Sequence, residues 1–467
     1  MRCCTSLAAC VLLAPEALGC GEVVAQPIGF ASGDGGVRLD AGLGASLDSG
    51  PSVDSGSNGD TGTRSFCAGQ GPIPLAGRSA CIGDLADVFR FAACACKSFD
   101  VSGSLSTDSF DSTSDGGPAS GDFASIGSNG EISTSSMLSI GGSLWTGGPG
   151  PDGGPAVTLN GGVSAGGTIA NDVHSAADMQ VGGKYLVDGD LWANGNVIVE
   201  PGGSLAVLGT LYVPAGDSTS DVQAPVVNAQ VPVTAPCSCA TPIDVSAVVA
   251  AYANANDDSS IGLAADAPLK GTLSLPCGLY YVPAIAGDAV NLQVAGRVAL
   301  FVAGDISVTQ DLRIELAAGA EVDLFVAGNV SIMGGFEIGD ADSPARTRVY
   351  VGGTTLALAA NANPLAANIY APNAVLELAS NFEMWGSLLA GRLQLSGNFA
   401  LHYDTSVLQV AEASGCAPSA GSCQSCGDCG GATPACKAGT CSPCATTADC
   451  CAPLRCDGSG RCVLEIP

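Results

Sequence analysis

The central part of the chain repeats a short pattern in which a run of apolar residues ends at a glycine corner and a second short run follows. The clearest copies, at 300–308 and 324–332, read Leu-Phe-Val-Ala-Gly-Asp-Ile-Ser-Val and Leu-Phe-Val-Ala-Gly-Asn-Val-Ser-Ile, at an offset of 24 residues. Each copy predicts two short strands, because β-branched and aromatic residues favour strands and glycine favours sharp corners. A fixed period of this size is typical of a solenoid, in which each coil buries its inner face against its neighbours. Looser copies begin at Tyr185, Val207, Val349 and Leu388.

These repeats predict an all-β fold, a β-solenoid with three short faces per coil, in two parts that span 120–215 and 279–412. The alternative is a β-sandwich of short strands. The near identity of the two 24-residue copies favours the solenoid, because a sandwich does not require successive strands to repeat one sequence.

Residues 216–278 interrupt the repeat and predict an insert that contains a helix. Thr241 is the expected N-cap, with Pro242 in the first turn. We expect the insert to lie against the solenoid, clamped by disulfides among Cys237, Cys239 and Cys277. The residues that share the apolar face of the predicted helix are Val245, Val248, Val249 and Tyr252.

Three segments of different character precede the repeat. Residues 1–20 combine a small positive start with a short apolar stretch, which predicts an export signal too short to span a bilayer. The signal ends in Leu18-Gly19-Cys20, typical of bacterial lipoproteins, so Cys20 is the expected lipidation site; cleavage without lipid attachment is the alternative. Residues 21–65 are rich in Gly, Ser and Asp and predict a disordered tether. Residues 66–119 predict a cysteine-containing cap with a short helix near 82–89, covering the first edge of the solenoid.

The 22 cysteines indicate an oxidising compartment. Beyond Cys20, seven lie before residue 280 and eleven after residue 415, so full oxidation requires at least one disulfide between body and tail. Cys416 is the expected tail partner because it stands apart from the dense cluster. The cysteines expected in disulfides are Cys67, Cys81, Cys94, Cys96, Cys237, Cys239, Cys277, Cys416, Cys423, Cys426, Cys429, Cys436, Cys441, Cys444, Cys450, Cys451, Cys456 and Cys462.

Residues 413–467 predict a disulfide-rich module, because they contain few large apolar residues and cannot be held by a core. Their cysteine ladder, with the adjacent pair Cys450-Cys451, resembles that of knottin and Dickkopf-type modules. The spacing of Cys423, Cys426 and Cys429 also suits a zinc site, but zinc requires thiolates, and an oxidising compartment favours disulfides.

The charge and residue counts exclude several functions. The chain carries 44 acidic and 16 basic residues, a net charge of -28, which argues against nucleic acid as a partner. Its two histidines are His174 and His402. Alternation along a strand places His402 and Asp404 on one face, and we expect a hydrogen-bonded terminal coil there and not a catalytic set. No catalytic residue is predicted.

Some acidic residues are candidates for calcium ligands or for turns. Asp190, Asp305 and Asn329 each follow a corner glycine, a position where such residues stabilise turns. Asn256-Asp257-Asp258 and the pair Asp340 and Asp342 offer oxygen ligands for calcium, although neither matches a full calcium loop. We therefore expect no cofactor, with calcium as the one candidate ion.

The order of these parts resembles a family of bacterial lipoproteins built on a β-helix domain of unknown function, over about residues 67–410. The resemblance implies a right-handed β-helix and a surface location, and it supplies no catalytic residue. The motifs that carry it are Cys94-x-Cys96, Cys237-x-Cys239, Leu275-Pro276-Cys277-Gly278, the twin Leu-Phe-Val-Ala-Gly strands, Tyr370-Ala371-Pro372-Asn373-Ala374 and His402-Tyr403-Asp404.

These features predict a cell-surface structural or adhesive lipoprotein at the outer membrane, joined to the membrane by its lipid and facing a glycan or a surface protein. The alternative is a surface carbohydrate-active enzyme, a polysaccharide lyase or glycoside hydrolase on the same solenoid. A third hypothesis makes the disulfide-rich tail a protein-binding or inhibitory module.

Overall fold

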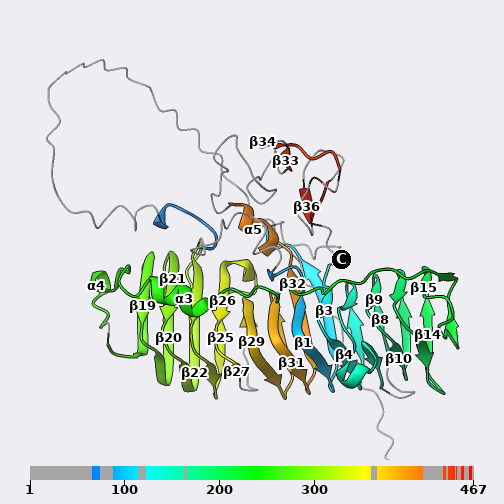
Figure 1. Cartoon of the computed structure of the whole chain (residues 1–467). Coiled ribbons are helices and arrows are strands. Elements are labelled where there is room, and N and C mark those ends of the chain that lie inside the picture. Colours follow the sequence, from blue (N-terminus) through cyan, green and yellow to red (C-terminus); the bar gives the residue numbers. More distant parts are fainter. Residues whose placement is uncertain are drawn as a thin grey trace, which may run out of the picture. The chain divides into compact units, whose positions relative to one another are not determined.

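The structure is a computed structural model of the whole chain (Figure 1). It describes residues 66–73, 88–113, 123–161, 166–264, 266–358, 365–413, 435–437, 440–446, 449, 454–456 and 462–464. The predicted export signal, the predicted tether and residues 82–87 of the helix predicted near 82–89 lie outside these residues.

Most of the described residues belong to one 32-stranded sheet that winds into coils. Within this sheet every described strand pair is parallel, and each strand pairs with one that lies two or three positions away in the chain, apart from the junction described below. Such pairing is the pattern of a solenoid, whereas sandwich sheets are antiparallel. The predicted all-β, solenoid-like fold is thus confirmed. The two copies of the predicted 24-residue repeat pair in register on neighbouring coils, Leu300 with Leu324 and Ile306 with Val330.

The strands fall into two halves with three faces. Face 1 contains β3, β6 and β9, face 2 contains β4, β7 and β10, and face 3 contains β5, β8 and β11. The first half consists of β1 (Ala93–Val101), β2 (Leu105–Phe110), β3 (Ile126–Ser128), β4 (Glu131–Thr134), β5 (Leu138–Ile140), β6 (Leu144–Thr146), β7 (Val157–Leu159), β8 (Gly166–Ile169), β9 (Val173–Ser175), β10 (Met179–Val181), β11 (Lys184–Val187), β12 (Leu191–Ala193), β13 (Val197–Val199), β14 (Ser204–Val207), β15 (Leu211–Val213), β16 (Val222–Gln223) and β17 (Val226–Asn228).

The second half returns through longer strands, several of which cross a corner and serve two faces. It consists of β18 (Leu269–Leu275), β19 (Gly278–Val282), β20 (Ile285–Val294), β21 (Arg297–Val302), β22 (Ile306–Leu316), β23 (Glu321–Val326), β24 (Val330–Ile332), β25 (Phe336–Ile338), β26 (Thr347–Val351), β27 (Thr355–Leu358), β28 (Leu365–Ala366), β29 (Asn368–Leu378), β30 (Phe382–Trp385), β31 (Leu388–Leu395) and β32 (Phe399–Asp404). The helices are α3 (Val245–Ala251), α4 (Asp258–Ile261), α5 (Val407–Ala413) and the 3-10 turns η1 (Pro151–Gly153) and η2 (Pro344–Arg346).

The two halves meet at a junction, the seam, between the last coil of the second half and the first coil of the first half. β31 pairs with β1 and β32 pairs with β2, all parallel. The opposite edges of β1 and β2 pair with β3, β4 and β5. The chain therefore enters the stack at its middle, winds outward to β17, begins again at the opposite end with β18 and winds back to the middle (Figure 1).

This arrangement differs from the expected cap over residues 66–119. β1 and β2, which lie inside that range, are strands of the solenoid with both edges paired. The second half supplies the partner for their first edge, so no separate cap is needed there. Sequence periodicity could not reveal this, because the partner strands lie nearly 300 residues away.

Residues 229–268, the return strap, connect the two ends of the stack and run back along the coils (Figure 1). The strap packs directly on corner glycines of the first half: a Cβ added at Gly147 would lie 2.6 Å from the Cα of Ala235. Further along, the buried face of α3 lies against β23 and the second half. The strap thus contacts both halves. It is shorter than the insert expected at 216–278, because β16, β17 and β18 lie within that range and belong to the solenoid.

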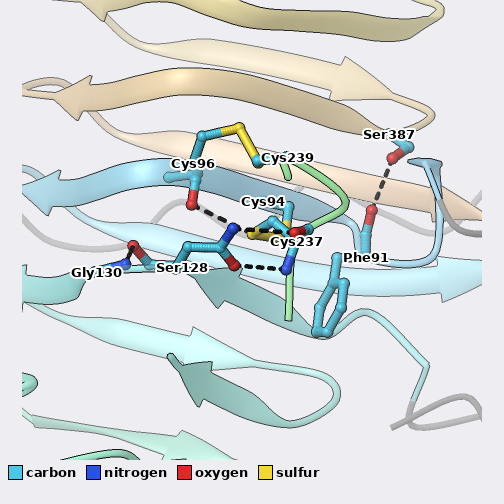
Figure 2. Close-up of a disulfide and its surroundings, with 10 residues drawn as sticks. Phe91, Cys94, Cys96, Ser128, Gly130, Cys237, Cys239 and Ser387 are labelled. Carbon is cyan, nitrogen blue, oxygen red and sulfur yellow. Dashed lines mark hydrogen bonds between the residues drawn. A yellow bond between two sulfur atoms is a disulfide. The ribbon is translucent and has the colours of Figure 1, made fainter. Parts of the chain in front are cut away.

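The disulfides of the strap differ from the expected clamp. Cys94 bonds Cys237 and Cys96 bonds Cys239, so the strap is joined to the first coil next to the seam (Figure 2). Cys277 bonds Cys67. The expected pairing among Cys237, Cys239 and Cys277 is therefore wrong, because the strap lies on coils formed by other parts of the chain.

Helix α3 keeps its predicted apolar face but begins later than predicted. Val245, Val248 and Val249 are buried. The N-cap is Asp244, whose carboxylate accepts a hydrogen bond of 2.9 Å from the amide of Ala247, and not Thr241. The preceding segment is held away from helical geometry because the amide of Ile243 donates to the Tyr370 hydroxyl.

In the second half, face 1 is buried on both sides beneath the strap. Tyr252 of the strap stacks on Phe301 at 4.0 Å between ring centroids, and Phe325 and Tyr350 continue the stack on the next coils. In β23 every residue is buried. This explains why the repeat reads as a continuous apolar run there and not as a clean alternation.

The segment 66–73 is held on the second half by a buried ion network. Arg348 of β26 is 1% exposed and contacts the carboxylates of Asp323 and Glu321 at 2.5 and 2.9 Å. These carboxylates also accept hydrogen bonds from the amides of Ile73 and Gly71. Burial by itself lowers the pKa of the Arg348 guanidinium, but the two carboxylates more than offset burial and raise it.

In the tail, the structure describes two short antiparallel hairpins. They are formed by β33 (Ala435–Lys437) with β34 (Thr440–Ser442) and by β35 (Leu454–Cys456) with β36 (Cys462–Leu464). Cys444 and Cys456 form a disulfide. Cys81, Cys416, the Cys450-Cys451 pair and the candidate zinc ligands lie outside the described residues, so the expected link between body and tail stays a prediction.

Candidate functional site: a polar groove across the seam

A hollow of about 550 Å³ crosses face 2 where the two halves of the solenoid meet. We call it the polar groove. It extends over five neighbouring strands, β29, β31, β1, β4 and β7, with the seam in the middle. The residues that line it are Asp100, Val101, Ser102, Ser133, Thr134, Ser135, Thr158, Asn160, Glu377, Leu378, Ala379, Gln394, Leu395 and Ser396.

The floor of the polar groove is a row of polar side chains at matching positions on successive coils. Glu377 pairs with Gln394, Gln394 with Asp100, Asp100 with Ser133, and Ser133 with Thr158. Because side chains alternate across a strand, these residues point outward while their neighbours point into the core. Parallel pairing in register thus aligns five polar groups that are far apart in the sequence.

Hydrogen bonds hold the central carboxylate of this row in place. Asp100 accepts from the Ser133 hydroxyl at 2.8 Å and from the Ser98 hydroxyl at 3.2 Å. A second row runs beside the first, in which Arg392 and Glu131 both pair with Ser98. Burial raises the pKa of Glu131, Asp100 raises it further, and Arg392 opposes both effects.

Residues 238–410 match the model of a family described as a domain of unknown function (DUF7305). The match covers the strap from Ser238 and the second half, and it leaves out β1 to β17. No curated protein and no solved structure matches this chain. The groove is therefore shared between the matched segment, which supplies Glu377 and Gln394, and a part of the chain outside it, which supplies Asp100 and Ser133.

The matched segment also contains His402, which lies on face 3 at the seam. Its Nδ1 lies 2.8 Å from Asp108 of β2, and its Nε2 lies 3.1 Å from Glu383 of β30. Hydrogen bonding to Asp108 raises the pKa of His402, burial opposes this, and Glu383 adds to the increase. Both ring nitrogens have carboxylate partners, so the ring is placed as an ionic link between three coils and not as a base beside a hydroxyl.

Asp404, the expected neighbour of His402, is buried at the seam, so the coil that contains both residues lies in the middle of the stack and is not the expected terminal coil. Its carboxylate accepts hydrogen bonds from Ser112 and Ser406 and from the amide of Ala345. His174, the second histidine, is stacked between Trp145 and Trp192 at 3.6 and 4.4 Å. Burial, assisted by Arg90, lowers the pKa of His174 to about 3, so the ring is neutral at pH 7.

The predicted turn residues have the structural role expected of them. The Asp190 carboxylate accepts from the amide of Thr210 on the next coil, and Asp305 accepts from Asn329, both at 2.7 Å. Asn329 in turn accepts from the amide of Thr354. The glycine at such a corner is required, because a Cβ at Gly328 would lie 2.2 Å from the Asp305 carboxylate.

The candidate calcium ligands are occupied by backbone contacts. Asp257 and Asp258 accept from the amides of Leu279 and Tyr281, and so they cover the outer edge of β19. Asp340 accepts from the amide of Asp342 within one turn. Among the described residues there is no group of three or more His, Cys, Asp or Glu side chains placed to hold a metal ion. In the same residues no helix is long and apolar enough to cross a membrane.

Sequence reasoning did not find the polar groove. Its central residues, Asp100 and Gln394, lie in segments with no motif in common, and Asp100 falls in the range expected to be a cap. Only the strand pairing at the seam brings these residues together, and that pairing is known only once the two halves have been placed against each other. Cys20, the expected lipidation site, lies outside the described residues.

Proposed function

We propose that this protein is an exported, lipid-anchored surface protein with a structural or adhesive role, and that the polar groove is its binding surface. Disulfides form and persist in oxidising compartments, and four join the described residues. The expected signal ending at Cys20 and the acidic tether support attachment to the outer surface. We further infer that the solenoid is right-handed, because parallel β-crossovers within one sheet almost always are, and that the tail is a knottin- or Dickkopf-like module.

The observation that carries the adhesive role is the position of the groove at the seam, beside two disulfides that join β1 to the strap. The groove needs both halves, and the disulfides of Cys94 and Cys96 lie on β1, one of its five strands. A surface held in one arrangement before it meets a ligand loses little conformational entropy on binding. A structural protein that only spans a distance would not need a polar hollow at this place.

One observation favours a second candidate, a surface glycoside hydrolase or polysaccharide lyase. Asp100 and Glu131 interact electrostatically beside the groove, and the pKa of Glu131 is raised by burial and then by Asp100. A carboxyl group with a raised pKa beside a second carboxylate is the usual general acid of such enzymes. Release of reducing ends or unsaturated products from a polysaccharide, lost in Glu131→Gln, would establish this function in place of the non-catalytic one.

The anchoring proposal is tested by labelling cells with a palmitate analogue. The full-length protein is expected to take up the label, to lose it in the presence of globomycin, and to lose it in Cys20→Ser. Cys10→Ser is the matched control, since Cys10 follows a similar small-residue motif within the apolar stretch. Unlabelled protein in the medium would contradict lipid anchoring.

The adhesive proposal is tested on the same cells. Cells that display the protein are expected to attach to a polysaccharide-rich surface more than cells that lack it, and external protease is expected to remove the difference. Equal attachment by both strains would contradict the adhesive role.

A further inference from the structure

The polar groove has the chemistry of a site for sugar hydroxyls. Gln394 and the serine and threonine hydroxyls both donate and accept hydrogen bonds, while the Asp100 and Glu377 carboxylates accept them. Such a mixed set, repeated on every coil, matches a ligand that presents donors and acceptors at regular intervals along its length. Small-molecule sites usually have few polar groups, whereas ten of the fourteen residues that line this groove are polar.

We propose that the groove binds an uncharged polysaccharide chain that lies across the coils, over the seam. This inference rests on the proposed adhesive function and names its ligand. The floor row extends over four steps between neighbouring strands, about 19 Å at the usual strand spacing. That length accommodates a short stretch of a longer glycan, whose two ends continue over the coils on either side.

The charge of the groove selects against acidic ligands. Among the described lining residues there is neither Lys nor Arg, and two carboxylates face the hollow. Arg392 lies in the adjacent row but shares it with Glu131, which has the opposite charge. The whole chain carries a net charge of -28. Polyanionic glycans would therefore meet repulsion at close and at long range.

The backbone of the groove selects against an extended peptide. A peptide that binds by strand addition needs a strand with a free edge. Each of the five groove strands is already paired on both edges, as β1 is by β31 and by β3 and β4. Recognition at this surface must therefore come from side chains, and side-chain hydroxyl, amide and carboxylate groups are those that recognise sugars.

The Asp100 carboxylate is also able to accept hydrogen bonds from a ligand. The two serine hydroxyls fix the carboxylate and occupy one lone-pair site on each oxygen, so further sites remain. Hydrogen bonds to charged groups are the stronger ones, and two hydroxyls hold Asp100 in place, so Asp100 is expected to contribute more than the uncharged side chains of the floor. Loss of its charge should weaken binding by about tenfold.

The inference is tested by isothermal titration of the full-length exported protein, disulfides intact, with neutral hexasaccharides and with hexagalacturonate as the acidic probe. The neutral set comprises β-1,4-glucan, β-1,3-glucan, β-1,4-mannan and β-1,4-galactan. At least one neutral probe is expected to bind, with affinity unchanged by EDTA, and the acidic probe is expected not to bind. Asp100→Asn should weaken binding about tenfold, and Ser135→Trp, which fills the exposed side of the groove, should abolish it.

Ser307→Trp is the matched control. Ser307 is exposed like Ser135, but it lies on β22, away from the groove, so this variant should bind as the wild type does. Binding that resists Ser135→Trp, that requires a divalent cation, or that favours the acidic probe would overturn the inference, as would no binding to any neutral probe. Attachment of cells without glycan binding would overturn the inference alone, whereas binding followed by cleavage of the probe would overturn the non-catalytic function alone.

Discussion

The Ser387 hydroxyl donates a hydrogen bond of 2.7 Å to the backbone carbonyl of Phe91, which lies 296 residues earlier in the chain (Figure 2). Ser387 immediately precedes β31 and Phe91 lies two residues before β1, so this bond joins the two segments where the paired strands begin. Ser387 is fully buried. The seam therefore carries a specific polar contact as well as strand pairing and apolar packing.

Replacement of this hydroxyl is expected to weaken the seam. Ser387→Ala leaves the buried Phe91 carbonyl without its donor, which should lower the free energy of unfolding by about 1–3 kcal/mol. Urea unfolding followed by circular dichroism measures the change. Ser307→Ala is the control, because Ser307 is exposed and its loss should change stability by less than about 0.5 kcal/mol. Equal effects of the two variants would contradict the role assigned to Ser387.

The two disulfides beside the seam are expected to be strongly non-additive. Cys94–Cys237 and Cys96–Cys239 each span 143 residues and enclose nearly the same loop. Once one bond is formed, the other closes a ring of a few residues. Loss of one pair to alanine should therefore cost about 2 kcal/mol or less, whereas loss of both should cost about 5 kcal/mol.

Denaturant unfolding of the three variants under non-reducing conditions measures this coupling. The Cys67–Cys277 pair, which spans 210 residues, is the control. It lies on other coils, so its removal should add to the loss of Cys94–Cys237 without coupling. Single losses that sum to the double loss would show that the two bonds act on separate loops.

The buried guanidinium of Arg348 is expected to be the charge whose loss destabilises the described part of the chain most. Arg348→Met leaves the buried Asp323 carboxylate without its ion-pair partner and leaves Glu321 with Arg297 at 3.6 Å, which should lower the free energy of unfolding by about 3–5 kcal/mol. Arg313 offers a matched control, since its pair with Glu337 spans 3.5 Å and both side chains are more than 40% exposed. Arg313→Met should cost less than about 1 kcal/mol. A similar midpoint of thermal unfolding for both variants would contradict the assignment.

The sequence predicted the coil and not the order of the coils. The repeat at Leu300 and Leu324 is a local pattern, and stacking converts it directly into register. The contact between β31 and β1 leaves no such pattern, because parallel pairing depends on shape and apolar burial, which all coils share. The disulfide partners were missed for the same reason: Cys237 is near Cys239 in the chain, yet the strap carries both to β1.

The groove could not be predicted for the same reason, because the pairing of β31 with β1 leaves no pattern in the sequence. Its floor residues, such as Asp100 and Gln394, are ordinary polar positions of a strand when read alone, and an exposed polar residue on a strand carries no functional signal. They become a site only when the seam places them side by side. The turn role of Asp305, by contrast, was predictable because it depends on the adjacent glycine corner and on the next copy of the repeat.

His402 is expected to make the seam more stable at mildly acidic pH. The pKa of His402 is raised in the folded protein, chiefly by hydrogen bonding to Asp108. A group whose pKa rises on folding binds a proton more tightly in the native state. Its stabilising effect is thus complete below the unfolded pKa, about 6.5, and is lost as pH rises through the higher folded value.

The measurement is the difference in melting temperature between the wild type and His402→Gln, taken from about pH 5 to pH 9. The melting temperature of the wild type should exceed that of His402→Gln most between about pH 5 and 6.5, and this difference should shrink at higher pH. Asp108→Asn should flatten this dependence, because it removes the largest cause of the shift, and Glu383→Gln should flatten it less. A difference in melting temperature that is constant with pH, or that grows as pH rises, would show that His402 acts by packing against Trp385 and not as the ionic link across the seam.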